Sequence, residues 1–500
     1  MAIPAEQQET AAFLGKLSGS APLETPISAI FLGADTAWKL KKAVRLTFLD
    51  FTTARARRRF IEREFVLNAP AAPGLYQAVM AVIRNPDGQL ALTAFPPPDA
   101  AVLDWVLRMA RVPQDDFLDR IADSGGLTPV LLDELGDAVA AYHQRLSPVA
   151  DTVAGKDMRT VIAENRAAAR GTALPPDQID AWHAAAQSQL ECLAPWLRCR
   201  AEQGFLRRGH GDLHLGNLCR WQGKIVPFDA LEFDEALATI DLGYDLAFLL
   251  MDLDRRAGRG AANRVMNRYI ARTGDTGLTR FLPVFLSVRA LIRAHVIARG
   301  TGLAAALPYL DAAQAYLVAM PPIVVAIGGL PGTGKSTLAR ALAPDLGGAP
   351  GAVVLRSDEI RKRIYGVAPE TRLPPDAYAD DVSAVVFATL SALAHATASG
   401  GHAVIADATF LDPAHRQAIA TAAHTASVRF IGLWLTAPLT FLEARISARS
   451  GDASDATVAV LQAAAARATV PPDWQIIEAS DLDSALRNAR EFVRTGPGIC

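Results

Sequence analysis

Hydrophobic and polar residues alternate with the two-residue period of β-strands in two stretches of the first hundred residues. I-S-A-I-F-L and A-W-K-L-K lie on either side of the turn G-A-D-T, and Q-A-V-M-A-V-I-R and Q-L-A-L-T-A-F lie on either side of N-P-D-G. The two hairpins predict a small antiparallel sheet. Between them, Thr53–Asn68 is charged and has a helical period, which predicts a helix packed on that sheet. Val102–Val112 is expected to be a connecting hinge.

The pattern becomes mostly helical from Leu131 to about Leu317, with an interruption near Gly204–Ala230 that is typical of a catalytic loop. Met320-Pro321-Pro322 marks the expected domain boundary. Beyond it, short apolar runs alternate with helical patterns, as the strands of a parallel α/β sheet do. These runs are Ile323–Ile327, Ala352–Leu355, Ala403–Ala406 and Phe430–Leu435.

Composition limits the classes of function only weakly. The 500 residues, 51% of them hydrophobic, suffice for two or three domains with their own cores. A net charge of -2 gives no overall reason to expect nucleic-acid or membrane binding. No basic segment followed by an apolar one opens the chain, and no uncharged run is long enough to span a bilayer, so we expect a cytoplasmic protein. The cysteines form no C-x-x-C pair, which favours reduced thiols; they are Cys192, Cys199, Cys219 and Cys500.

The run G-L-P-G-T-G-K-S follows an apolar, strand-like run and precedes a helical pattern, which is the context of a P-loop (Walker A motif). Glycines let successive backbone N–H groups turn toward phosphates. Lys335 reaches the β- and γ-phosphates, and the Ser336 hydroxyl holds Mg²⁺. A glycine-rich turn without a ligand is the structural alternative. The residues expected to bind ATP here are Gly329, Leu330, Pro331, Gly332, Thr333, Gly334, Lys335, Ser336 and Thr337.

A second phosphate-handling signature, H-G-D-L-H-L-G-N at His210–Asn217, resembles the catalytic loop of aminoglycoside phosphotransferase-like kinases, which share the protein-kinase fold. The resemblance extends over roughly residues 25 to 315. It implies that Asp212 accepts or orients the proton of a substrate hydroxyl and that Asn217 helps to bind Mg²⁺. In I-V-P-F-D-A, Asp229 matches the position of the family's metal-binding aspartate. A loop cap at Asp212 and a turn residue at Asp229 are the structural alternatives.

A kinase site also needs a cation for the α- and β-phosphates, and A-W-K-L-K offers Lys39 and Lys41 on one face of a strand. Lys39 is our choice. The charged helix offers Glu62 or Glu64 as its partner, and Glu64 fits the resemblance better; a solvated helix face is the alternative.

Two features qualify this upstream site. No G-x-G-x-x-G precedes it, and only Gly33 stands in the corresponding turn. A zinc site at His210 and His214 lacks a third nearby ligand, so His210 is expected to brace the loop. Asp241 and Asp245 are expected to support the loop without taking part in the chemistry.

Downstream of the P-loop, Asp358 and Arg361 in R-S-D-E-I-R-K resemble the D-x-x-R of small P-loop kinases of the polynucleotide-kinase and zeta-toxin type. The resemblance implies a general base at Asp358 and an acceptor contact at Arg361; a helix cap with a surface arginine is the alternative. Asp407 ends a strand-like run as a Walker-B-like carboxylate for Mg²⁺ does, and Thr409 and Arg416 are candidates to extend that site.

Arg445 and Arg449 stand four residues apart, so a helix presents both on one face. This resembles the arginine-bearing lid of the same kinases, which closes over ATP and neutralises charge during transfer. A solvated helix is the alternative.

Together these patterns predict an α+β protein-kinase-like domain, residues 1–320, followed by an α/β P-loop NTPase domain with a parallel sheet, residues 321–500. The architecture resembles proteins that pair an aminoglycoside phosphotransferase-like domain with an AAA-type P-loop kinase domain. We expect a bifunctional ATP- and Mg²⁺-dependent phosphotransferase acting on small-molecule acceptors that the motifs do not define. The alternatives are that one domain is a nucleotide-dependent regulatory module, or that the downstream domain phosphorylates nucleic-acid ends. The oligomeric state is not defined by these patterns.

Overall fold

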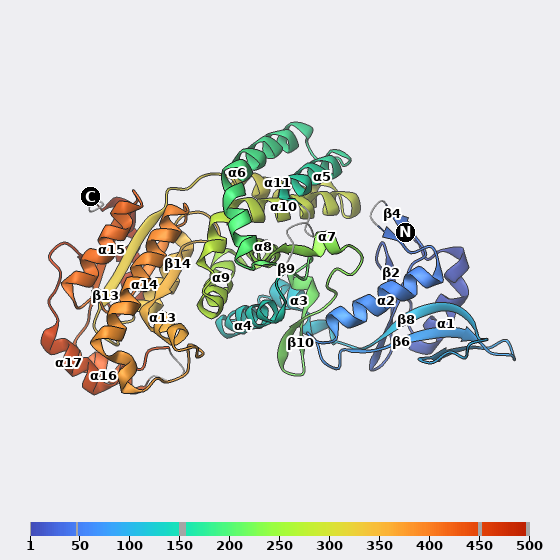
Figure 1. Ribbon diagram of the computed structural model, residues 1–500, viewed down its shortest axis with the longest axis horizontal. Coiled ribbons are helices and arrows are strands. Elements are labelled where there is room, and N and C mark those ends of the chain that lie inside the picture. The colour runs from blue at the N-terminus through green and yellow to red at the C-terminus, as the bar shows by residue number, and fades with distance from the viewer. Residues whose placement is uncertain (1, 47–48, 150–156, 449–452, 497–500) are drawn as a thin grey trace. The chain divides into compact units, whose positions relative to one another are not determined.

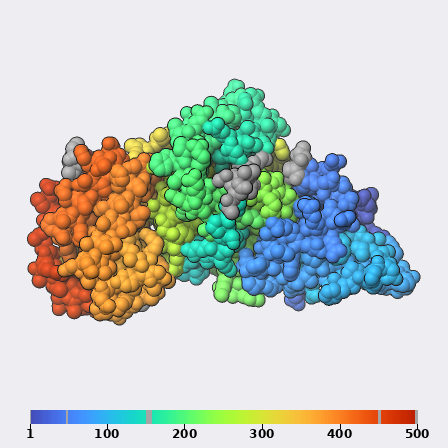
Figure 2. Space-filling model, viewed as in Figure 1, coloured from blue at the N-terminus to red at the C-terminus, as the bar shows by residue number. Residues whose placement is uncertain are grey.

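The computed structural model describes residues 2–46, 49–149, 157–448 and 453–496 (Figure 1). The chain divides into two compact units. The first comprises Met1–Gly126, Ala141–Met158 and Pro195–Leu249, and the second comprises Leu127–Ala140, Arg159–Ala194 and Leu250–Cys500. Figure 2 shows the N-terminal residues, in blue, as closely packed side chains.

The N-terminal part of the first unit is a six-stranded sheet with the order β1-β2-β3-β8-β6-β7. All its paired strands are antiparallel, which confirms the two predicted hairpins. The expected hinge at Val102–Val112 is wrong, because most of it is a strand paired on both sides, with β3 and β6. The strands are β1 (Leu23–Glu24), β2 (Ser28–Leu32), β3 (Thr36–Lys41), β6 (Tyr76–Arg84), β7 (Leu90–Thr93) and β8 (Ala101–Ala110).

Helices cover the two faces of this sheet. Helix α1 (Gln8–Ser18) packs against β2 and β3, and helix α2 (Ala54–Asn68) packs against β6 and β8. Side chains of β8 alternate accordingly: Val106 joins the core beneath α1, whereas Trp105 and Leu107 join the core beneath α2. The charged helix expected at Thr53–Asn68 is therefore present, with the Thr53 side chain as its N-cap.

Most of the remaining residues before the P-loop are helical, as predicted, and two small antiparallel strand pairs flank the loop of the H-G-D-L-H-L-G-N motif. The short elements are β4 (Arg45–Leu46), β5 (Leu49–Asp50), α3 (Leu118–Asp123), β9 (Leu206–Arg208), β10 (Leu218–Trp221), β11 (Lys224–Pro227), α7 (Glu235–Ala238) and β12 (Thr239–Asp241). The longer helices are α4 (Pro129–Arg145), α5 (Met158–Arg170), α6 (Pro176–Glu202), α8 (Leu242–Ala257), α9 (Arg259–Thr273), α10 (Leu282–Gly300) and α11 (Leu303–Ala315).

The C-terminal part of the second unit is a five-stranded parallel sheet with the order β14-β15-β13-β16-β17. The strands are β13 (Ile323–Gly329), β14 (Val353–Arg356), β15 (Val404–Asp407), β16 (Arg429–Thr436) and β17 (Gln475–Glu478). The helices are α12 (Lys335–Leu342), α13 (Ser357–Ile364), α14 (Asp380–Ser399), α15 (Pro413–Thr425), α16 (Leu439–Ala448), α17 (Val458–Arg467) and α18 (Leu482–Thr495). The predicted strand and helix alternation, and with it the fold class, is confirmed.

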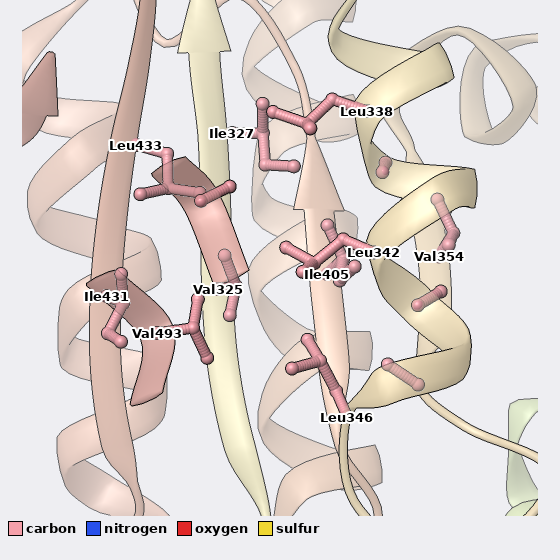
Figure 3. Close-up of a cluster of buried hydrophobic side chains, with 14 of the residues drawn as sticks. Val325, Ile327, Leu338, Leu342, Leu346, Val354, Ile405, Ile431, Leu433 and Val493 are labelled. Atoms are coloured by element: carbon pink, nitrogen blue, oxygen red, sulfur yellow. The ribbon is translucent and has the colours of Figure 1, made fainter. Parts of the chain in front are cut away.

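Apolar side chains from both faces of these strands are buried, which explains their nearly continuous hydrophobic runs. On one face, α12 and α18 pack together against β13, β15 and β16, and Figure 3 shows Leu338 and Leu342 of α12 directed toward this sheet. On the other face, α14 and α15 contact the strands. This core fixes the carboxyl ends of the strands, from which the P-loop and α13 begin.

Helix α9 caps the edge strand β14 within the second unit. Asn267 Oδ1 accepts a hydrogen bond from Val354 N at 2.7 Å, and Asn267 Nδ2 donates to Ala352 O at 3.1 Å. Asn263 Nδ2 donates to the same carbonyl at 3.0 Å. An edge strand exposes backbone groups that need partners, and these two amides supply them in the way a neighbouring strand would.

Two helical stretches of the described residues are long and apolar enough to cross a membrane by length and composition alone. They are Thr276–Gly300, whose most apolar window is 67% buried, and Asp380–Ser399, whose window is 33% buried. Core helices pass the same test. The first stretch includes α10, which packs on α11, and the second is α14, which packs on the sheet.

Replacing Asn267 by Leu is expected to leave the buried Val354 amide without an acceptor. The opening free energy of that amide should fall by about 1–3 kcal/mol, because an unsatisfied buried donor loses both water and its partner. Amide hydrogen exchange at Val354 measures this loss. Gly260→Ala, at an exposed position of the same helix, is the control and should not accelerate exchange. Unchanged exchange at Val354 in Asn267→Leu would contradict the capping role.

Candidate functional sites

Two lysines of β3 share one buried glutamate in the first unit. Lys39 Nζ lies 2.8 Å from Glu64 Oε1, and Lys41 Nζ lies 2.7 Å from Glu64 Oε2. Lys39 also contacts Asp229 Oδ1 at 2.6 Å, and Lys41 contacts Glu232. The strand period places both lysines on the face covered by α2, while Trp38 and Leu40 point to the other face. The structure therefore brings the predicted residues Lys39, Glu64 and Asp229 together.

The charges in this cluster hold one another ionised. Burial alone would raise the pKa of Glu64, but Lys39 and Lys41 lower it to about 2. Burial alone would lower the pKa of Lys39, but Asp229 and Glu64 raise it well above its ordinary value. The stabilisation from Glu64 is therefore complete above its ordinary pKa of 4.5 and is lost as the pH falls toward 2.

The catalytic-loop signature forms a compact network around Asp212. Asn217 Nδ2 donates to Asp212 Oδ2 at 3.0 Å and to the Asp212 carbonyl at 2.9 Å. His214 Nδ1 accepts from Gly216 N, so a neutral His214 carries its proton on Nε2, which lies 3.4 Å from Asp212 Oδ2. Asp212 remains 44% exposed. Its carboxylate is thus oriented by two neighbours and accessible to an acceptor.

Asp245 supports this loop, as expected. It accepts hydrogen bonds from His210 N at 2.6 Å and Gly211 N at 3.0 Å. His210 Nε2 lies 2.9 Å from the Phe228 carbonyl, in agreement with a bracing role. His143 Nε2, at 3.2 Å from Asp245 Oδ2, is a further buried partner that sequence patterns did not indicate. Asp241 forms an ion pair with Arg200, which agrees with the structural role expected for it.

The β10–β11 hairpin brings the two candidate metal ligands of this unit close in the fold. Asn217 directly precedes β10 and Asp229 follows β11, and Phe228 N donates to the Asn217 carbonyl at 3.0 Å. Asp229 has a left-handed backbone with φ 61°, which is uncommon for a residue other than glycine. Tyr76 Oη accepts from Asp229 N at 2.9 Å and helps to hold this conformation.

Sequence reasoning missed the groups that fix this turn. Asn68 Oδ1, on α2, accepts from Ala230 N at 2.9 Å, and Glu232 completes the pairing of Lys41. The position of Glu232 three residues after Asp229 was the only local signal. Its partner lies 191 residues away along the chain, so sequence spacing could not identify the pair.

The P-loop has the backbone that its glycines allow. Gly329 has φ 135°, and a Cβ there would lie 2.5 Å from the Leu435 carbonyl; Gly334, with φ 87°, caps α12. Lys335 Nζ donates to the carbonyls of Gly329 and Leu330 at 3.0 and 2.9 Å. The buried Thr333 side chain also donates to Leu330 O. Ser336 and Thr337 follow in the first turn of α12, with Thr337 exposed.

Arg445 lies beside this loop. A Cβ at Gly334 would be 3.5 Å from Arg445 Nη1, and the guanidinium lies 4.3 Å from the ring centre of Phe441. This places the predicted lid arginine near the last glycine of the phosphate-binding loop. Arg449, its predicted companion, lies outside the described residues.

The carboxyl ends of β14 and β15 carry a cluster of charges. Arg356 Nε lies 3.3 Å from Asp407 Oδ2, and Arg356 Nη1 lies 2.9 Å from Glu359. Loss of hydration raises the pKa of Asp358, against the effect of Arg356 and of a hydrogen bond from Ser454. A carboxyl with a raised pKa is a stronger base once it is ionised, which suits proton removal from a hydroxyl.

The Arg361 side chain already has interaction partners within the protein. Its guanidinium donates to the Ala377 carbonyl at 2.6 Å and to Ser383 Oγ at 3.2 Å, and it lies 4.7 Å from the ring centre of Tyr378. Arg416 likewise donates to backbone carbonyls, those of Phe410 and Leu411. The Thr409 carbonyl accepts from Gly329 N and so joins this loop to the P-loop.

Among the described residues, no three His, Cys, Asp or Glu side chains gather into a group that could hold a metal ion. Each unit instead has two candidate Mg²⁺ ligands. These are Asn217 and Asp229 in the first unit, and Ser336 and Asp407 in the second. Their donor atoms are all oxygens, which fits a hard cation. Mg²⁺ at kinase sites also takes ligands from the nucleotide phosphates, so two protein ligands suffice.

Replacing Glu64 by Gln is expected to cost about 3 kcal/mol of unfolding free energy, because two buried lysines lose their shared negative charge. Urea unfolding measures the change. Glu62→Gln is the matched control on the same helix: Glu62 is 47% exposed and pairs with Arg58 at the surface, so its loss should be below about 1 kcal/mol. Equal losses in the two variants would contradict the assignment of Glu64 as the buried partner.

Parts of the chain are similar to known proteins. The family model described as AAA domain matches residues 324–471. An uncharacterized protein of Mycobacterium tuberculosis is 29% identical over 474 residues, which is 90% of each chain. The aminoglycoside phosphotransferase APH(4)-Ia aligns with 62% of this chain and 98% of its own, at 15% identity and a TM-score of 0.37. A gluconokinase from Sinorhizobium meliloti aligns with 35% of this chain and 93% of its own, at 18% identity and a TM-score of 0.26.

The resemblance and the class of enzyme predicted from the sequence agree with these findings. The P-loop geometry, the charged sites and the family match make the chain a phosphotransferase by class. Residues 324–471, which include the P-loop and the parallel sheet, are the part of the chain that matches the AAA-domain model.

Proposed function

We propose that the chain is a bifunctional ATP-dependent phosphotransferase that moves the γ-phosphate of ATP to hydroxyl groups of small molecules. The observation that supports this proposal is that each compact unit has its own candidate cation for the phosphates and its own candidate base. These are Lys39 with Asp212 in the first unit and Lys335 with Asp358 in the second. The domains are proposed to divide at residues 320 and 321, where the proline pair precedes β13.

In the upstream reaction, Lys39 binds the α- and β-phosphates while Glu64 holds its ammonium group in place. Asp212 accepts the proton of the acceptor hydroxyl. The hydroxyl oxygen forms the new bond to the γ-phosphorus, and the bond from this phosphorus to ADP breaks, so that ADP leaves. Asn217 and His214 orient the Asp212 carboxylate, which reduces the number of orientations that must be lost in the transition state.

In the downstream reaction, the P-loop amides and Lys335 bind the phosphates, and Asp358 accepts the acceptor proton. Arg445, beside Gly334, neutralises charge that develops on the transferred group. Lys335 now contacts two loop carbonyls, so binding of phosphate requires it to exchange these weak acceptors for charged oxygens. Arg361 is the proposed acceptor contact, and in this role its guanidinium exchanges the Ala377 carbonyl for the acceptor.

ATP and Mg²⁺ are the proposed cofactors at both sites. Asn217 and Asp229 would hold the metal upstream; Ser336 and, through water, Asp407 would hold it downstream. The metal would neutralise phosphate charge in both reactions. We further propose a cytoplasmic location and no membrane partner.

A regulatory role for the upstream nucleotide site is the second candidate. Its support is the connection between β2 and β3, a tight turn in which Gly33 N donates to Thr36 O at 2.7 Å, with a single glycine. Such a turn offers fewer backbone donors to phosphates than a glycine-rich loop does. In that case ATP would bind and change the affinity of the other site without forming a product.

Label transfer from γ-labelled ATP to a panel of sugars, aminoglycosides and other hydroxyl metabolites should yield two products. Asp212→Asn should reduce the upstream product about 100-fold or more and spare the downstream one, because the base is lost and the P-loop is intact. Lys335→Ala should do the reverse. Each variant is thus the control for the other. ATP binding without transfer to any acceptor would favour the regulatory role.

The polynucleotide-kinase resemblance is tested separately, with 5′-hydroxyl oligonucleotides over a range of salt concentrations. We expect no end labelling above that of Lys335→Ala, because the sequence of the P-loop domain has no cluster of basic residues with interleaved aromatic residues of the kind that binds nucleic acid. End labelling that is lost in both Lys335→Ala and Asp358→Asn would instead establish a nucleic-acid acceptor.

A further inference from the structure

Lys362 is a fully buried cation next to the proposed downstream base. It lies on α13, one helical turn after Asp358, so the two side chains leave the same face of the helix. Its ammonium group lies 2.5 Å from Asp455 Oδ2 and also donates to the Thr371 carbonyl. A lysine with no exposed surface needs such partners, because an unpaired buried charge is strongly destabilising.

Asp455 joins three segments that are distant in sequence. Besides Lys362, its carboxylate accepts from Tyr378 Oη at 2.5 Å and from Leu373 N at 3.0 Å. Tyr378 ends the short 3-10 helix Pro375–Tyr378, which also receives the Arg361 guanidinium at the Ala377 carbonyl. One carboxylate therefore ties α13 to the segment 371–378 and to the segment 453–457.

The residue before Asp455 reaches the proposed base itself. The Ser454 side chain lies close enough to Asp358 to favour the ionised form of its carboxyl group. Two consecutive residues, Ser454 and Asp455, thus contact two residues one turn apart on α13, Asp358 and Lys362. Either contact constrains the backbone that makes the other.

We propose that Lys362 and Asp455 are positioning residues for the downstream phosphotransfer: their ion pair holds Ser454 against Asp358 and Tyr378 beside Arg361, so that the base has one orientation. This assignment rests on the proposed function of Asp358. It gives the buried Lys362 a task next to the proposed acceptor contact Arg361, which is to fix the two segments that surround the base. Neither Lys362 nor Asp455 needs to touch the substrate.

Hydrogen exchange tests the positioning directly, without a known acceptor. In Lys362→Met and in Asp455→Asn, amides in the segments 371–378 and 453–457 should exchange about 10-fold faster or more, while the P-loop amides keep their rates. The milder variant Tyr378→Phe should accelerate exchange in the same segments to a smaller extent, and it guards against misfolding of the first two. Asp376→Asn, an exposed position in the same 3-10 helix, is the matched control and should have no effect.

Kinetics of the downstream product test the functional part. Loss of Lys362 or Asp455 should lower kcat by about 10- to 100-fold, since small misplacements of reacting groups have effects of this size. The dissociation constant for ATP should stay within about twofold, and the double variant should be no slower than the worse single one.

The outcomes separate this inference from the proposed function. If Asp358→Asn abolishes transfer but Lys362→Met and Asp455→Asn retain the wild-type kcat, the positioning role is overturned and the base is not. If exchange in the two segments is unchanged, or if the double variant shows the product of the two single effects, the shared positioning role is also overturned. If Asp358→Asn retains transfer, the proposed function of Asp358 fails, and the role of Lys362 in it fails as well.

Discussion

Each of the two sites contains a fully buried charged side chain, and a buried charge requires an oppositely charged partner. In the first unit, Glu64 is fully buried and lies between Lys39 and Lys41. These ion pairs hold strand β3 and helix α2 in place against each other. In the second unit, Lys362 is fully buried and reaches Asp455. Breaking either pair leaves an uncompensated charge, which costs far more than a surface ion pair contributes. The charges that we propose to position the phosphates and a base are therefore also structural elements of their units.

The downstream site depends on its edge strand in a second way. β14 leads directly into α13, which carries Asp358, Arg361 and Lys362, and its open edge is closed by two asparagines of α9. Side-chain amides satisfy the backbone of this strand where a further strand is missing. The start of α13 is thus fixed by hydrogen bonds on both sides of β14, from β15 and from α9.

Local patterns were sufficient for most of the elements and for single motifs. The period of β3 identified Lys39 and Lys41 as sharing a face, and the P-loop followed from its glycines and flanking apolar run. Val102–Val112 was misjudged because its strand character depends on two partners, β3 and β6, that lie far along the chain. Glu232 and Asp455 were missed for the same reason: each acquires its role from a lysine that no spacing rule connects to it.

The two proposed bases differ in how their orientation is secured. Asp212 is 44% exposed and is held by Asn217 and His214 from its own loop, so the catalytic-loop motif contains most of what it needs. Asp358 has a raised pKa because it has lost hydration, and the neighbouring hydroxyl that favours its ionised form belongs to Ser454, far along the chain. A short motif is therefore a sufficient description of the upstream base but not of the downstream one. The orientation of Asp358 is a property of the folded P-loop domain, because it requires the pair Lys362 and Asp455 to bring the Ser454 segment into place.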